Sequence, residues 1–291
     1  AEAAYRQAIA LDEKNADTWG GLGDLLQYRL ERYDEAETAY RQAIALDEKW
    51  AGPWGGLGDL LQHRLDRYEE AEAAYRKAIV LDEKDAHLWN SLGNLLQDYL
   101  ARYEDALAAY KQGLAINAQT SSLLANSAYL CGLHLEQPDE ARAYAKQAES
   151  GLSPAGKHLL NSMLAWCDGD ADASSRGWSE LHQAVSCDDS ALWTAYLDDL
   201  QRILAYATAR GDVATVLDWM SDADYPLQYS PLYHAYYAAL NDEDHLLSIN
   251  PEVRGEAEKI YRGLARLLVL FKSEKPPTKR KLVPGRRTSC P

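Results

Sequence analysis

Cysteine is scarce in this sequence: the 291 residues include four cysteines, and no two of them form a Cys-x-x-Cys pair. That number and spacing exclude a disulfide framework and a cysteine-ligated zinc site, and they favour a reducing, cytoplasmic location. Long apolar runs are also missing, so we expect no membrane-spanning helix and no membrane partner. No signal peptide is visible. The sequence starts without methionine and in mid-pattern, which suggests a fragment of a longer protein.

Signatures of catalysis and of metal binding are missing as well. There is no glycine-rich phosphate loop and no His-Glu-x-x-His segment, and the seven histidines are scattered. The segment Gly151–Gly156 has the wrong spacing for a nucleophile elbow, and a helix N-cap accounts for its serine. The alternating carboxylates of 168–172 lack the glutamate that completes a calcium loop. We therefore predict a non-enzymatic protein with no cofactor and no metal.

Positive charge is under-represented, with 30 Lys and Arg against 45 Asp and Glu and a net charge of −15. The last segment, 272–291, reverses the sign, because it holds seven basic residues and Glu274 alone. Without that contribution of +6, residues 1–271 carry −21. Nucleic acid is therefore an improbable partner except through the tail, which we expect to be disordered. The tail could also act as an address, fold back on the acidic body, or remain solvated.

A repeat of 35 residues organises the first half of the chain. Residues 1–35 and 36–70 differ at seven of 35 positions, a third copy covers 71–105, and a fourth, divergent copy begins at Ala106. A fixed period of this length indicates a repeat architecture, in which each unit buries its apolar face against its neighbours.

Each copy contains two helical patterns, recognised by apolar residues at i, i+3, i+4 and i+7. In the first copy these residues are Trp19, Leu22, Gly23, Leu26 and Leu30, then Tyr33, Ala36, Tyr40, Ala43 and Ile44. The joint around 29–32 is too short for anything but an antiparallel helix pair. Neither helix can bury its apolar stripe alone, so successive pairs must stack into a solenoid.

These residues resemble the tetratricopeptide repeat (TPR), most closely over 1–119 and less so to 150. The matching positions in the first copy are Trp19, Leu22, Gly23, Leu26, Ala36, Tyr40 and Ala43. The resemblance implies an all-α, right-handed α-solenoid of antiparallel helix pairs that serves as a protein-binding scaffold. Two features depart from the family pattern. The extra residue of the 35-residue period falls in the joint, where the usual glycine is absent, and Glu48 and Glu83 replace the closing proline.

The face of each first helix opposite its apolar stripe is the predicted partner site. In the resembled family this face lines the concave groove that holds partner peptides. Copy by copy, the predicted groove residues are Asp17, Gly20, Gly21, Asp24, Gln27 and Tyr28, then Gly52, Gly55, Gly56, Asp59, Gln62 and His63, then His87, Asn90, Ser91, Asn94, Gln97 and Asp98.

Differences between the first two copies support this placement. The non-conservative changes all lie in the inter-repeat turn or at the ends of the groove face: Asn15 to Trp50, Asp17 to Gly52, Thr18 to Pro53 and Tyr28 to His63. Free drift of surface positions would explain part of the pattern. Gly20 and Gly21 each cost about 1 kcal/mol inside a helix relative to alanine. Either a partner's backbone approaches them, or a neighbouring helix already fills that space.

The chemistry of the groove predicts the kind of partner. Some members of the resembled family hold a C-terminal carboxylate with basic residues and asparagines on this face. Here Gly20, Gly55 and Asn90 occupy the basic positions, and Asp24 and Asp59 replace two of the asparagines. An acidic terminus would be repelled, so we expect a neutral or basic peptide or protein segment, with the chain's own tail as one candidate.

Beyond Gly151 the helical pattern continues without the repeat consensus. We divide the chain into a repeat array (1–150), a divergent helical-repeat region (151–271) and the basic tail (272–291). Within the second region, Ser153 and Pro154 have the residue types of a helix N-cap and first helical position.

Two other functions stay open at this point. The chain could be the sensor or recruitment region of a larger effector enzyme whose catalytic domain lies upstream. It could also be a hydrolase that uses Cys167 or Cys187 with His158 or His182, although no spacing supports this. In addition, the apolar face of residues 1–14 lies at an open end of the solenoid, which predicts possible self-association.

Overall fold

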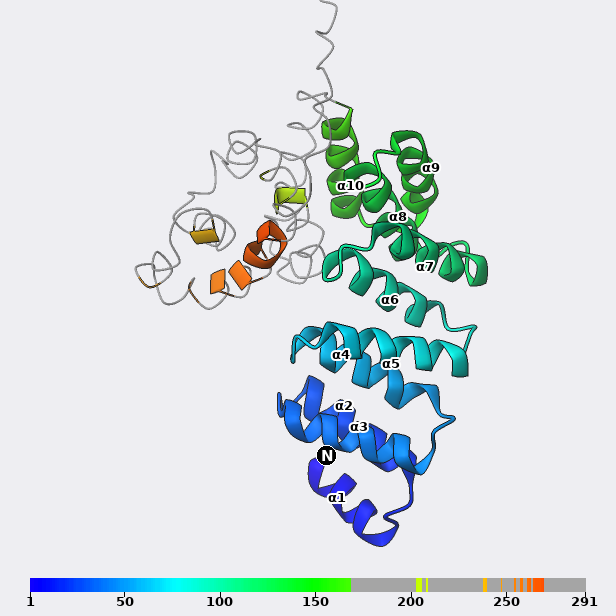
Figure 1. Ribbon diagram of the computed structural model, residues 1–291, viewed down its shortest axis with the longest axis vertical. Coiled ribbons are helices and arrows are strands. Elements are labelled where there is room, and N and C mark those ends of the chain that lie inside the picture. The colour runs from blue at the N-terminus through cyan, green and yellow to red at the C-terminus, as the bar shows by residue number, and fades with distance from the viewer. Residues whose placement is uncertain are drawn as a thin grey trace, which may run out of the picture. The chain divides into compact units, whose positions relative to one another are not determined.

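The computed structural model describes residues 1–168 together with short helical pieces farther along the chain (Figure 1). The pieces are 203–205, 208, 238–239, 247, 254, 257–258, 261–262 and 264–269. The chain divides into two compact units, Ala1–Leu130 and Cys131–Pro291. The boundary falls within a helix, whereas the predicted boundary at residue 150 marks the end of the repeat consensus and stays a prediction.

All elements of the described residues are helical, as predicted. In chain order they are α1 (Glu2–Leu11), α2 (Ala16–Tyr28), α3 (Tyr33–Leu46), α4 (Ala51–His63), α5 (Tyr68–Leu81), α6 (Ala86–Asp98), α7 (Tyr103–Ile116), α8 (Ser121–Leu133), α9 (Pro138–Ala148), a short 3₁₀ helix (Glu149–Gly151) and α10 (Pro154–Cys167).

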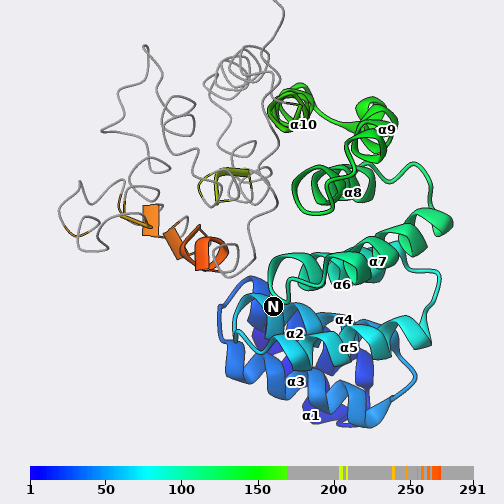
Figure 2. The same ribbon diagram turned by 45° about the horizontal axis from the view of Figure 1, so that its top comes forward.

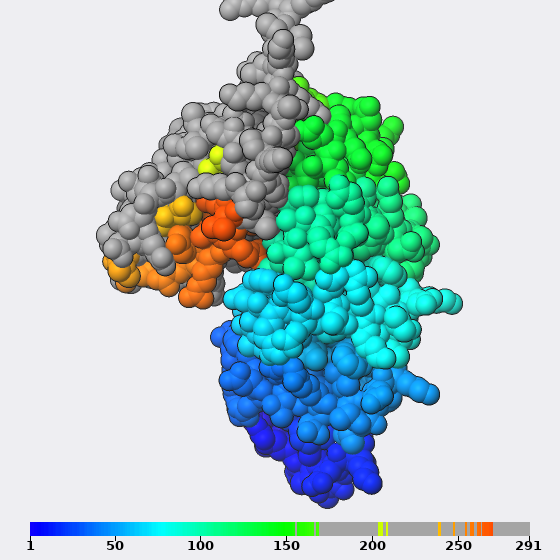
Figure 3. Space-filling model, in the orientation of Figure 1, coloured from blue at the N-terminus to red at the C-terminus, as the bar shows by residue number. Residues whose placement is uncertain are grey.

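The first unit is a stack of helix pairs. Helix α2 packs on α3, α4 on α5 and α6 on α7, and each pair contacts the next one through α3 and α4 or through α5 and α6. Figures 1 and 2 show these pairs following one another in chain order, and the space-filling view shows them as successive layers (Figure 3). The first helices of consecutive pairs, α2, α4 and α6, also contact one another. The predicted solenoid of antiparallel pairs is confirmed.

The joint within each pair turns without glycine. Glu31, Asp66 and Ala101 adopt the left-handed conformation, with φ between 51° and 54°, and Glu136 does the same before α9. The following amide then closes back on the helix, as when Arg32 N donates to the Leu26 carbonyl at 3.0 Å. Each joint therefore holds one residue in a strained conformation that glycine would adopt without strain.

The turn between successive pairs forms without the family's proline. Each turn begins with an aspartate or asparagine whose side chain accepts from the amide two residues on. Asp47 accepts from Lys49 N at 2.9 Å, and Asp82 accepts from Lys84 N at 3.1 Å. Such Asx turns fix the chain direction through a side-chain hydrogen bond. They account for the tolerance of Glu48 at the proline position.

The core of the pairs consists of leucines from the first helices and alanines and a tyrosine from the second. Leu26, Ala36 and Tyr40 are fully buried. A Cβ atom built on Gly23 would lie 2.7 Å from the Tyr40 ring, which is why this position, like Gly58 and Gly93 after it, cannot hold a larger residue. Close packing of the tyrosine ring against backbone thus explains why each copy has a glycine at this position.

An ion-pair ladder follows the second helices. Arg32, just before α3, pairs with Glu2 of α1 at 2.8 Å, and Arg67 pairs with Glu37 at 2.7 Å in the next copy. Arg102 continues the series with Glu72 of α5 at 2.9 Å. The arginine side chains are 35–43% exposed, so the effect of these ion pairs on stability is modest. Their regular spacing helps to set the register between neighbouring pairs.

In the second unit, Ser153 caps α10 as predicted, because its Oγ accepts from Gly156 N at 3.3 Å. Helix α10 separates His158 from Cys167 by nine residues, about 13 Å along the axis. A nucleophile and its base must lie within hydrogen-bond reach, so the suggested Cys167–His158 pairing is wrong. Cys187, His182, most of the helices predicted after 168 and the tail lie outside the described residues. None of the described helices is long and apolar enough to span a bilayer.

Candidate binding groove

The predicted groove residues lie on α2, α4 and α6, the helices that contact one another along the stack. Their exposure differs by position. Six are exposed: Asp17, Asp24, Tyr28, Gly52, His63 and His87. Six are half-buried: Gly21, Gly56, Asp59, Asn90, Ser91 and Asn94. The remaining six, Gly20, Gly55, Gln27, Gln62, Gln97 and Asp98, are buried. The buried third of the set packs within the array rather than offering side chains to a partner.

The three glutamines bind the core tyrosines. In the second copy, the Tyr75 hydroxyl donates to Gln62 Oε1 at 2.9 Å and to Asp59 Oδ1 at 2.6 Å. The first copy repeats this pattern with Tyr40, and the third repeats it with asparagine in place of the aspartate. The Tyr75 hydroxyl therefore holds the Asp59 carboxylate in place, while this side chain remains half-exposed at the groove.

Neighbouring copies are linked across the same face. The Tyr28 hydroxyl donates to Asp59 Oδ2 at 3.2 Å, so both oxygens of this carboxylate accept from tyrosines. At the next junction, His63 takes the place of Tyr28, and its Nδ1 lies 3.4 Å from the Tyr99 hydroxyl. In the third copy, Asn126 Nδ2 donates to Asn90 Oδ1 and Asn94 Oδ1 at 3.1 and 3.0 Å. The groove thus changes from carboxylate to amide chemistry along the stack.

Burial and carboxylate charge together disfavour ionisation of the tyrosines. The pKa values of Tyr40 and Tyr75 are raised above the ordinary tyrosine value, first by burial and then by a neighbouring aspartate. A buried hydroxyl next to a carboxylate stays protonated because a phenolate there would be desolvated and repelled. These hydroxyls are hydrogen-bond donors that hold the aspartates in place.

The unexplained glycines are explained by packing. A Cβ on Gly21 would lie 2.8 Å from the Tyr5 ring of α1, and a Cβ on Gly56 would lie 2.7 Å from the Tyr40 ring. A Cβ on Gly20 would meet the Trp50 ring at 2.6 Å. Neighbouring side chains already fill the space above these glycines. The alternative of a groove floor left open for a partner's backbone is therefore wrong at Gly20 and Gly21.

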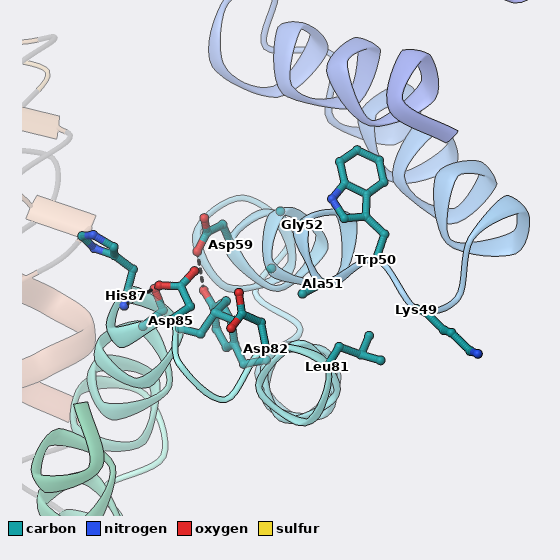
Figure 4. Close-up of a pocket in the computed structure, with 14 residues that line it drawn as sticks. Lys49, Trp50, Ala51, Gly52, Asp59, Leu81, Asp82, Asp85 and His87 are labelled. Atoms are coloured by element: carbon teal, nitrogen blue, oxygen red, sulfur yellow. Dashed lines mark hydrogen bonds between the residues drawn. The ribbon is translucent and has the colours of Figure 1, made fainter. Parts of the chain in front are cut away.

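A cavity of about 570 Å³ opens between α4 and α6 (Figure 4). Its walls include six of the predicted groove residues: Gly52, Gly55, Gly56, Asp59, His87 and Ser91. The turns before α4 and α6 supply Trp50, Asp82 and Asp85, and Lys49 is the one ammonium group among the lining residues. Figure 4 shows Trp50 on one side of the cavity and the three carboxylates on the other, with Lys49 extending away from them. The cavity is therefore aromatic on one side and acidic on the other.

The sequence predicted the residues of α4 and α6 that line the cavity, but not the residues of the inter-repeat turns that also line it. Asp82 and Asp85 belong to the inter-repeat turn, and they reach the cavity because the turn lies beside the N-terminus of α6. Trp50 was visible as a difference between copies but not as a wall of the site. The available signal was that the largest substitution between two nearly identical copies falls at the start of a groove helix.

Comparison with known proteins agrees with this architecture. The family profile described as "Tetratricopeptide repeat" matches residues 16–49 and 51–85. These residues are tetratricopeptide repeats. The helix pair α6 and α7 continues the TPR array with the same spacing and the same buried tyrosine. A search of curated proteins finds no match to the chain.

Solved structures of TPR proteins share the fold. PilW, described as a widely conserved type IV pilus biogenesis factor, is 25% identical with a TM-score of 0.56, and the match covers 66% of this chain and 88% of PilW. Pseudomonas aeruginosa PilF is 24% identical with a TM-score of 0.54, covering 63% of this chain and 82% of PilF. YrrB, described as a TPR protein with an unusual peptide-binding site, is 17% identical with a TM-score of 0.52, covering 65% and 95%. The TPR array supports a protein-interaction scaffold.

Proposed function

We propose that the TPR array binds a neutral or basic segment of another protein along α2, α4 and α6, with the cavity between α4 and α6 as its centre. The observation that carries this proposal is the cavity itself. It is large enough for a side chain with part of its backbone, and it presents Asp59, Asp82 and Asp85 against a single lysine. Charge complementarity of this kind selects against acidic segments, because like charges brought together in a groove cost binding energy.

The chain offers a way to test the charge without disturbing the fold. Each cavity aspartate has an asparagine at the equivalent position of another copy: Asn94 for Asp59, Asn117 for Asp82 and Asn15 for Asp85. Those asparagines accept the same kind of hydrogen bond, as Asn94 does from Tyr110 and Asn117 does from Gln119 N. A triple variant with these three replacements should therefore keep its helices while losing three negative charges from the cavity.

A random peptide library displayed on phage, selected on the immobilised chain, provides the probe. We expect the selected peptides to be neutral to basic and to bind the triple asparagine variant at least about tenfold more weakly, since about 1.4 kcal/mol of lost charge interaction suffices. Affinity for the unmodified chain should fall with added salt, as it does for exposed charges.

The matched control removes three charges elsewhere. Asp34→Asn, Glu69→Gln and Glu104→Gln alter exposed, equivalent positions in the first turns of α3, α5 and α7. This variant has the same net charge as the groove variant, and it should bind the selected peptides like the unmodified chain. Selection of acidic peptides, or equal binding by the groove variant and the unmodified chain, would refute the proposal.

A further inference from the structure

Three of the differences between the first two copies act together at one place in the structure. In the first copy, Asn15 caps α2 by accepting from Thr18 N at 3.0 Å. In the second copy, Pro53 replaces that threonine and has no amide hydrogen to donate. Trp50, at the capping position of α4, makes no capping hydrogen bond. The second copy thus lacks the capping bond of the first and places an aromatic side chain at that position.

Two glycines hold the tryptophan ring. A Cβ on Gly20 would lie 2.6 Å from the far edge of the ring, and a Cβ on Gly52 would lie 3.0 Å from its Nε1. Gly52 replaces the aspartate of the first copy, so the third difference makes room for the same ring. With Pro53 also beside Gly20, the ring is fixed as a wall of the cavity while remaining half-exposed. Free drift of a surface turn does not explain changes that converge on one side chain.

The opposite wall offers carboxylate oxygens. Asp82 Oδ1 accepts from Lys84 N, and Asp85 Oδ1 accepts from His87 N at 2.8 Å. Within the part of the chain that the structure describes, neither residue's Oδ2 makes a hydrogen bond. Asp59 adds a third carboxylate whose position is fixed by Tyr75 and Tyr28. The oxygens are thus oriented by the fold before any ligand binds, which lowers the cost of binding a cation.

From this arrangement we infer that the cavity between α4 and α6 is a subsite for an arginine side chain of the bound segment. The inference rests on the proposed function and names the group that the groove recognises. A guanidinium group is planar and stacks on an aromatic face such as that of Trp50. Its five N–H donors also match several carboxylates at once, as an ammonium group with three donors does less well. The cavity volume of about 570 Å³ accommodates an extended arginine side chain with its flanking backbone.

The test uses the whole chain and two small probes, Nα-acetyl-arginine amide and its citrulline counterpart. Citrulline has the shape of arginine without its charge, so the comparison isolates the guanidinium group. Binding is followed by NMR through the indole Nε1–H of Trp50, assigned with a Trp50→Phe variant, and through the amides of 82–88. We expect saturable, millimolar binding of the arginine derivative and at least about tenfold weaker binding of the citrulline derivative, as the loss of one charge-assisted pair predicts.

Two variants test the aromatic wall and the acidic wall of the cavity separately. Trp50→Asn restores the residue found at the same place in the first copy, and the triple asparagine variant of Asp59, Asp82 and Asp85 removes the facing charge. Each should weaken the arginine derivative severalfold, whereas the control variant of Asp34, Glu69 and Glu104 should not. Equal binding of the two derivatives, no saturable shift in the millimolar range, or shifts confined to residues outside the cavity would overturn the inference.

The outcomes separate the subsite from the function that it serves. If library peptides bind through the groove aspartates but the arginine derivative does not shift Trp50, the arginine subsite is wrong and groove binding stands. If the arginine derivative binds and no library peptide does, the cavity recognises the cation but the groove does not bind an extended segment.

Discussion

Removing the buried tyrosine hydroxyls one at a time tests the account of the groove aspartates most directly. Tyr75 and Tyr110 occupy equivalent positions in consecutive copies, and both side chains are fully buried. The Tyr75 hydroxyl donates to the carboxylate of Asp59 at 2.6 Å, whereas the Tyr110 hydroxyl donates to the amide oxygen of Asn94 at 2.8 Å. Each also donates to a buried glutamine. The two sites therefore differ mainly in the charge of one acceptor.

The expected magnitudes follow from that difference. A hydrogen bond between neutral groups contributes a net free energy of about 1 kcal/mol, and one to a charged group about 1.5–3 kcal/mol. Tyr75→Phe should therefore lower the free energy of unfolding by about 2–3 kcal/mol and Tyr110→Phe by about 1–1.5 kcal/mol. Both substitutions keep the ring that packs on Gly58 or Gly93, so no cavity contributes to the difference.

Urea denaturation monitored by circular dichroism measures both changes, and Asp59→Asn completes a double-mutant cycle. In the Asp59→Asn background the second copy has the same acceptor as the third, so Tyr75→Phe should then cost no more than Tyr110→Phe. Native-state hydrogen exchange of α4 and α5 amides should report the same local loss. A Tyr75→Phe cost equal to that of Tyr110→Phe in the unmodified background would refute the role assigned to Asp59.

Further predictions concern the joints, the close packing and the response to pH. Ala101→Gly should raise the free energy of unfolding by about 1 kcal/mol, and with it the urea midpoint, because glycine adopts the left-handed conformation of this position without strain. Ala108→Gly, on the exposed face of α7, should instead lower the free energy of unfolding by a similar amount, because glycine is unfavourable inside a helix. Gly58→Ala should destabilise the array by about 2 kcal/mol or more, measured in the same way, because its Cβ would lie 2.7 Å from the Tyr75 ring. Tyr40 and Tyr75 have folded-state pKa values above the ordinary tyrosine pKa of about 10. Above about pH 10 the tyrosines of the unfolded chain lose their protons while those of the folded chain keep them. The free energy of unfolding should therefore be constant below this pH and fall above it by up to about 1.4 kcal/mol per tyrosine for each pH unit. A urea midpoint that stays constant as the pH rises past this value would contradict that assignment.

The repeat determined the fold of the stacked helix pairs without any structure. A strict 35-residue period with two apolar stripes per copy leaves stacked antiparallel helix pairs as the way to bury both stripes, and the structure has them. Helix starts were predictable where a side chain caps the backbone, as at Ser153, because this signal is local. The left-handed residues of the joints were not predictable by type, since glutamate, aspartate and alanine occupy a place where glycine is expected.

The groove shows where local pattern stops being informative. Helical spacing placed Gln62 on the same face as Asp59, yet the glutamine is buried within the repeat, with its Oε1 2.9 Å from the Tyr75 hydroxyl. Spacing likewise left Gly20 unexplained, because the ring that fills the space above it belongs to Trp50, thirty residues away. Facing positions on one helix are fixed by its period, but contacts between copies depend on how the copies stack.

The sequence by itself thus determined the class of protein and the helices of the array, and it predicted the face that a partner would meet and the sign of that face's charge, because each follows from periodicity or composition. The tertiary structure alone decided which members of that face are accessible, and it brought the turn residues Asp82 and Asp85 opposite Trp50. The reason is physical: stacking brings the turn of one repeat beside the first helix of another, and the cavity between them exists in neither repeat alone.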